Sequence, residues 1–115
     1  MTEATHDSLR DLAQSTHDFY TRFGVVPEDP ANLPGALRNF HEEVREFEEA
    51  ARVMTDRDHI AEEAADVFVT AIGVCFAANV DVEQLIRQVY RVIAKNNAKT
   101  HQTHVLMAGK IRRRA

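Results

Sequence analysis

Two short acidic motifs constrain the fold of this chain more than any other feature. They read Glu-Glu-Val-Arg-Glu at 42–46 and Glu-Ala-Ala-Asp at 63–66. Each motif holds two carboxylates three residues apart, which a helix places one turn apart on the same face. Only a short polar segment, about 54–59, separates the two motif-bearing helices, and short connections favour antiparallel neighbours. The spacing therefore predicts that four carboxylates converge between two adjacent helices: Glu43, Glu46, Glu63 and Asp66.

Four carboxylates at one point repel each other unless a cation holds them. Oxygen ligands in that number suit Mg²⁺ or Mn²⁺ better than zinc. The competing interpretation is a solvated acidic helix face, or pairing of the carboxylates with Arg45 or Arg52. Asp66 favours the metal, because it directly precedes the uncharged run 67–78, and carboxylates next to buried segments are rarely left unpaired.

Helical periodicity predicts an all-α, four-to-five-helix bundle with helices at about 7–23, 36–54, 59–78 and 82–99. The segment 25–35 contains all three prolines and is expected to be an ordered connector. Asp56 or Asp58 can cap the third helix, and Asp81 with Gln84 forms a capping box for the fourth. The third helix is apolar nearly all round, which predicts that it is buried in a dimer interface. We expect one domain, 1–115.

Composition excludes several classes of function. The net charge of −4 argues against nucleic-acid binding, although 110–114 is locally basic. One cysteine, Cys75, allows no internal disulfide, the apolar run is too short to span a membrane, and no signal peptide is visible. A cytoplasmic protein is expected. His101 and His104 could bind zinc but lack a nearby third ligand, and His41 is expected to have a packing or surface role.

The two acidic motifs, in this order, resemble those of the MazG-like, all-α nucleoside triphosphate pyrophosphohydrolases. That superfamily also holds phosphoribosyl-ATP pyrophosphohydrolases and dimeric dUTPases. Asp-Phe-Tyr-x-x-Phe-Gly at 18–24, Asn-Asn-Ala-Lys at 96–99 and Gly-Lys at 109–110 are similar to elements of the phosphoribosyl-ATP pyrophosphohydrolase-like subgroup. Tyr90-Arg91 replaces the subgroup's Val-His pattern, and Ala98 replaces its Ser.

The resemblance implies Mg²⁺, or Mn²⁺, held by Glu43, Glu46, Glu63 and Asp66. Glu42 and Glu46 are the catalytic candidates, with Glu42 supporting a further ion or the attacking water. Lys95, Asn96 and Lys99 are expected to contact the nucleotide. The resemblance also implies a homodimer or homotetramer formed through helices. The expected reaction is hydrolysis of a nucleoside triphosphate to the monophosphate and pyrophosphate, as nucleotide house-cleaning. The alternatives are a phosphoribosyl-ATP pyrophosphohydrolase and a non-catalytic, metal-binding helical dimer.

Overall fold

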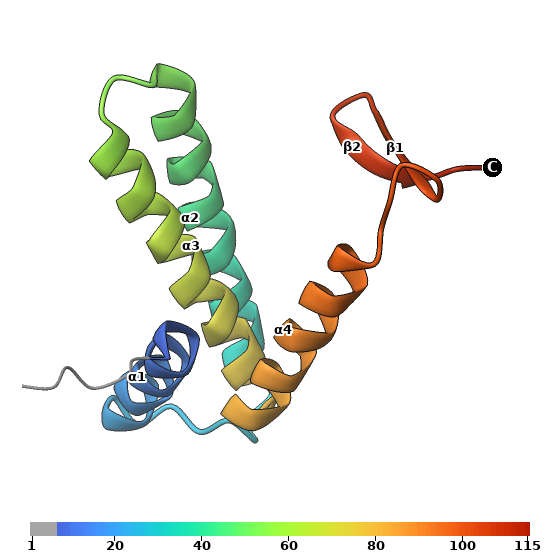
Figure 1. Ribbon diagram of the computed structural model, residues 1–115. Coiled ribbons are helices and arrows are strands. Elements are labelled where there is room, and N and C mark those ends of the chain that lie inside the picture. The colour runs from blue at the N-terminus through green and yellow to red at the C-terminus, as the bar shows by residue number, and fades with distance from the viewer. Residues whose placement is uncertain (1–6) are drawn as a thin grey trace, which may run out of the picture.

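The computed structural model describes residues 7–115, and within that range four helices are followed by a two-stranded hairpin (Figure 1). The helices are α1 (Ser8–Arg22), α2 (Asn32–Val53), α3 (Arg57–Ala77) and α4 (Val82–Asn97). The strands are β1 (His104–Met107) and β2 (Lys110–Arg113), paired antiparallel. The expected all-α class is confirmed. The hairpin is an addition, closed by Ala108 and Gly109, which both adopt the positive φ of a tight two-residue turn.

Local capping explains where the helices begin. Asp56 begins α3 by accepting a hydrogen bond from the backbone N–H of His59 at 3.1 Å. At α4 the expected capping box is present, because Asp81 and Gln84 each accept a hydrogen bond from the other's backbone N–H. Both caps satisfy backbone donors that have no partner inside the helix.

The second helix begins earlier than expected, at Asn32 rather than at 36. The prediction that the whole of 25–35 is connector is therefore wrong in its last four residues. Pro34 lies in the first turn of α2, where a backbone N–H has no acceptor within the helix in any case. Proline consequently costs little at this position and does not end the helix.

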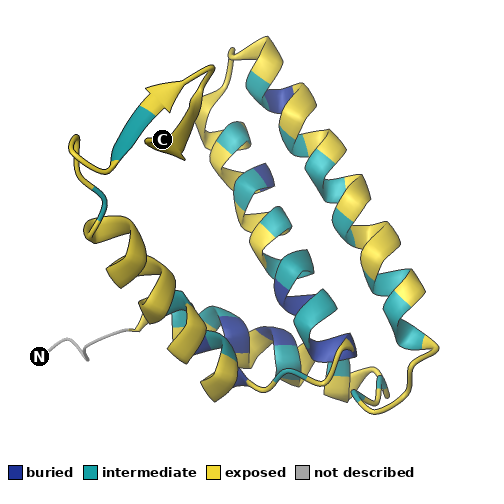
Figure 2. Cartoon of the chain, turned by 90° about the vertical axis from the view of Figure 1, so that its right-hand side faces the viewer, coloured by how far each residue is buried: buried dark blue, intermediate teal, exposed yellow. Residues whose placement is uncertain are grey.

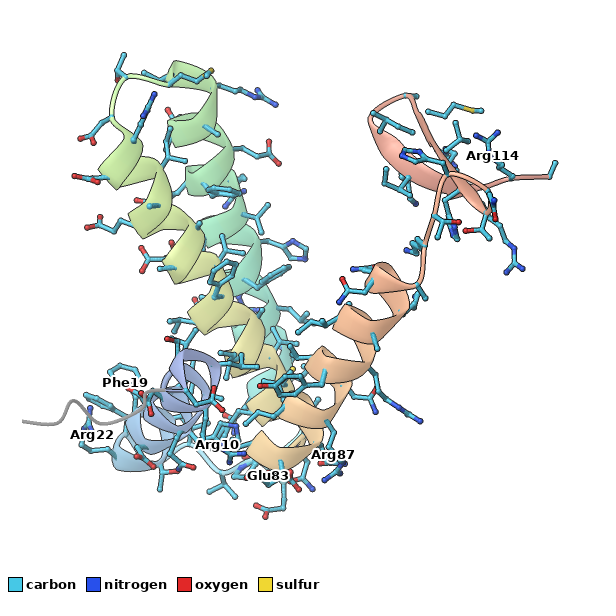
Figure 3. All side chains as sticks on the ribbon, in the orientation of Figure 1. Arg10, Phe19, Arg22, Glu83, Arg87 and Arg114 are labelled. Carbon is cyan, nitrogen blue, oxygen red and sulfur yellow. The ribbon has the colours of Figure 1, made fainter. Side chains whose placement is uncertain are left out.

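The long helices α2 and α3 lie antiparallel, side by side, and α1 packs across the base of α3 and α4 (Figure 1). A small core forms at that base, where Ala13 meets Ile72, Val82 and Ile86. At the same end of the molecule an ion pair between Arg10 and Glu83 links α1 to α4 (Figure 3). This base fixes α3, which carries the second acidic motif.

Beyond the base, α4 diverges from α2 and α3 and carries the hairpin away from them (Figures 1 and 2). Every residue from 90 to 98 is exposed. The radius of gyration is 17.1 Å, whereas a compact domain of this length has about 13 Å. The end of α4 and the hairpin therefore form an extended arm, residues 90–113, with little packing against the rest of its own chain. No helix among residues 7–115 is long and apolar enough to cross a membrane.

Candidate metal centre

The two acidic motifs meet across the α2–α3 interface. Glu43 comes from α2, and Glu63 and Asp66 come from α3. One carboxylate oxygen of each lies within 4.8 Å of the other two. We call these three residues the acidic triad. Because the helices are antiparallel, one turn of each motif faces one turn of the other, and this brings carboxylates twenty residues apart in sequence to one point.

Two oxygens of the triad are buried without a hydrogen bond. They are Oε2 of Glu43 and Oε2 of Glu63, neither of which has a partner among residues 7–115. No lysine or arginine in this described range forms an ion pair with the triad. A buried carboxylate oxygen left in this condition is costly. The donor set therefore fits a hard divalent cation, which would satisfy both oxygens together.

The pKa values of two triad carboxylates also favour a bound cation. Burial, and then the negative charge of Glu46, raise the pKa of Glu43 above its ordinary value. The same two causes, in the same order, raise the pKa of Glu63. Without a cation, the charged forms of Glu43 and Glu63 are therefore destabilised. A bound cation would relieve that destabilisation.

The other two predicted carboxylates differ in position. Glu46 lies close enough for its charge to act on both Glu43 and Glu63, although it is itself exposed. Glu42 is exposed and belongs to neither of the groups of potential ligands found among the described residues. The structure therefore places Glu46 beside the triad and Glu42 on the solvent side of α2.

A pocket of 310 Å³ adjoins the triad where the end of α2 meets the beginning of α3. We call it the His59 pocket. Its lining consists of Glu46, Glu49, Ala50, Val53, Thr55, Asp56, His59 and Glu63. His59 was not among the site residues that the sequence motifs predicted. The available signal was its position four residues before Glu63, which places the two side chains on one helix face.

The predicted nucleotide-binding residues lie elsewhere in the chain. Lys95, Asn96 and Lys99 stand at the end of α4, where Lys99 Nζ donates to Asn96 Oδ1 at 3.0 Å. Asn96 and Lys99 line an 810 Å³ cleft formed with the hairpin. This end of α4 is well separated from α2 and α3 (Figures 1 and 2). A single chain therefore does not bring these residues to the acidic triad.

The two histidines of the tail do not form a metal site by themselves. His104 Nδ1 lies 2.7 Å from Thr103 Oγ1 in a hydrogen bond. The groups of three potential ligands in residues 7–115 include neither His101 nor His104.

A carboxylate-only triad between two antiparallel helices suits a hard divalent cation, and such cations assist reactions at phosphoryl groups. Comparison with protein families agrees, since the family described as phosphoribosyl-ATP pyrophosphohydrolase matches residues 11–92. The chain belongs to this family, and through it to the MazG-like nucleotide pyrophosphohydrolase superfamily, a divalent-metal-dependent class. No curated protein and no solved structure matches the chain.

Proposed function

We propose that the chain hydrolyses a nucleoside triphosphate to the monophosphate and pyrophosphate, as nucleotide house-cleaning, at a Mg²⁺ centre held by Glu43, Glu46, Glu63 and Asp66. The observation that carries the proposal is the convergence of the acidic triad within 4.8 Å, with two buried oxygens that have no partner among the described residues. A triphosphate brings further negative charge to this point, so the same cations that hold the triad would also hold the substrate.

Each residue has a distinct task in this reaction. When bound, Mg²⁺ neutralises phosphate charge and lowers the pKa of water. Glu46, exposed and next to the triad, can accept the proton of the attacking water. Glu42, on the solvent side, can orient that water or support a further ion. Lys95 and Lys99 neutralise the departing pyrophosphate, and the side-chain amide of Asn96 donates to the nucleotide.

A second copy of the chain would complete this site. The chain exposes 9051 Å², whereas a folded monomer of this size exposes about 6,300 Å². Large apolar side chains contribute to the excess, among them Phe68 on α3 (57% exposed) and Tyr90 on α4 (59% exposed). We propose a homodimer or homotetramer in which these faces are covered and the arm of one chain lies over the acidic triad of another.

A second substrate has specific support. The family that matches residues 11–92 is described by phosphoribosyl-ATP hydrolysis, so this nucleotide is the alternative to a simple triphosphate. The match ends before Lys95, Asn96 and Lys99, the predicted nucleotide contacts. The part of the chain expected to choose the substrate thus lies outside the matched range, and substrate identity has to be measured.

The test is pyrophosphate release from a panel of ribo- and deoxynucleoside triphosphates and phosphoribosyl-ATP, with Mg²⁺ and with EDTA. We expect turnover on one or a few substrates, its loss in EDTA, and a loss of more than about 100-fold in Glu63→Gln, since a metal ligand supplies several kcal/mol of transition-state stabilisation. Glu48→Gln is the matched control, because Glu48 lies on the exposed face of α2 and pairs only with Arg52 at 3.4 Å among the described residues. If no substrate of the panel releases pyrophosphate while Mg²⁺ still raises the melting temperature, the chain is a non-catalytic metal-binding protein.

A further inference from the structure

We propose that His59, Glu62 and Glu63 form a second cation site beside the acidic triad, and that its imidazole ligand favours a transition-metal ion such as Mn²⁺ over Mg²⁺. The three residues lie on the first two turns of α3. Their spacing of i, i+3 and i+4 puts all three side chains on one face of the helix. Two of the three, His59 and Glu63, line the His59 pocket near the α2–α3 connection.

The geometry suits a shared ion better than direct contacts between the side chains. His59 Nε2 lies 3.8 Å from Glu63 Oε1, and His59 Nδ1 lies 3.9 Å from Glu62 Oε1. Both distances are too long for hydrogen bonds. Ligand atoms around an ion at about 2.0–2.2 Å stand roughly 3 to 3.5 Å from each other. One imidazole nitrogen and one oxygen of each glutamate lie within 4.8 Å of one another. Side-chain movements of about one to two ångström would therefore bring these three atoms to a common ion.

Glu63 is the buried member of this group of three. Only 9% of the Glu63 residue is exposed, and its Oε2 has no hydrogen-bond partner among residues 7–115. Glu63 also belongs to both groups of potential ligands, the acidic triad and the His59 group. A carboxylate has two oxygens, so Glu63 can bridge two ions at the short separation typical of two-metal sites.

The His59 pocket offers both room and charge for this ion. Its volume of 310 Å³ accommodates an ion with several waters, and no lysine or arginine lines it. Glu46, Glu49 and Asp56 add carboxylates to the lining. Asp56 also accepts the backbone N–H of His59 at 3.1 Å. That cap holds the beginning of α3, and with it the backbone of His59, in place.

The nitrogen ligand decides which metal is favoured. Mg²⁺ prefers oxygen ligands and gives up its water reluctantly, whereas imidazole suits first-row transition metals. The acidic triad, with oxygen ligands alone, suits Mg²⁺. The inference rests on the proposed Mg²⁺ centre only through the shared ligand Glu63, and ion binding can be measured without any nucleotide.

The test uses Mn²⁺ bound to the metal-free protein in excess Mg²⁺, with pulsed EPR to detect coupling of the Mn²⁺ electron spin to ¹⁴N. We expect nitrogen coupling in the wild-type protein, its loss in His59→Gln, and its retention in His101→Gln, a control histidine in the exposed tail. Glu43→Gln should also keep the coupling, because Glu43 belongs only to the acidic triad.

Absence of nitrogen coupling in the wild-type protein, or its persistence in His59→Gln, would overturn the proposal. Thermal melts of each variant establish that it is folded, and His59 is suited to this test because its side chain is 52% exposed. Pyrophosphate release with Mg²⁺ alone is measured separately on the wild-type protein. The proposed hydrolysis and the second ion can therefore fail independently of each other.

Discussion

The hydroxyl group of Tyr20 lies against the backbone of Gly73, where α1 crosses α3. A Cβ atom at position 73 would stand 2.5 Å from the Tyr20 hydroxyl oxygen and 3.0 Å from its Cε2. The Tyr20 ring also stacks on Phe76, one turn further along α3, with centroids 5.6 Å apart. The glycine thus permits the close approach that holds α3, and with it two of the three residues of the acidic triad, against the base of the molecule.

Gly73→Ala should lower the free energy of unfolding by about 1 to 3 kcal/mol. The new methyl group displaces the Tyr20 ring, and the resulting loss of packing exceeds the gain of up to about 1 kcal/mol from helix propensity. Urea denaturation followed by circular dichroism measures the change. In a Tyr20→Phe background the cost should shrink, because the nearest atom to the new methyl group is absent. An equal cost in both backgrounds would contradict this explanation.

Gly35→Ala is the matched control and should have the opposite sign. Gly35 also lies in a helix, but the nearest atom to its added Cβ would be Arg38 Nη2 at 3.8 Å, an ordinary contact. Alanine should therefore raise the free energy of unfolding by roughly 0.5 kcal/mol through helix propensity alone. The same urea titration measures it, and a destabilisation would show that the beginning of α2 is more crowded than the structure indicates.

Removing one negative charge from the triad should stabilise the metal-free protein and weaken its stabilisation by Mg²⁺. In EDTA, Glu63→Gln should melt at a higher temperature than the wild-type protein, because it removes a buried carboxylate that lies near Glu46. Mg²⁺ at 100 times its dissociation constant should stabilise the wild-type protein by about 2.7 kcal/mol and the variant much less. Differential scanning calorimetry with and without Mg²⁺ compares them; an equal Mg²⁺ effect on both would exclude Glu63 as a ligand.

Stability should depend on pH through Glu43 in a defined direction. Burial, followed by the charge of Glu46, raises the pKa of Glu43 in the folded state above its ordinary value. Its favourable contribution is therefore complete below the unfolded pKa of about 4.3 and is lost as the pH rises through the folded pKa. In EDTA, the stability of Glu43→Gln relative to the wild-type protein should rise across this window and then level off. Chemical denaturation at a series of pH values measures it, with Glu48→Gln as control; a difference that falls with pH would contradict it.

A charge on the exposed apolar face of α3 should break the proposed oligomer. Phe68 is 57% exposed in the single chain, and Phe68→Asp would place a carboxylate in an interface that covers it. Sedimentation velocity should show a wild-type dimer or tetramer and a smaller species for the variant. Val26→Asp is the control, since Val26 is similarly exposed, at 51%, but lies in the connector. A monomeric wild-type protein would contradict the proposed assembly.

Local sequence rules predicted most of the helical framework. Apolar spacing located each helix to within a few residues, and the Asp81–Gln84 capping box is present as expected. The predicted beginning of α2 was four residues late for a local reason. Proline stops a helix when it lies in the helix interior, but Pro34 lies in the first turn, where proline is tolerated. The hairpin was also missed, since its two strands are only four residues each and alternate weakly.

What the sequence determined by itself is which carboxylates share a helix face, because residues three and four apart are neighbours on any helix. The short connection predicted that the two acidic motifs converge, but only the tertiary structure decided which of their carboxylates meet. The antiparallel packing of α2 on α3 joins Glu43 to Glu63 and Asp66, opens the His59 pocket beside them, and leaves Lys99 far away on the arm. These relationships depend on packing between residues distant in sequence, and helix periodicity carries no information about that packing.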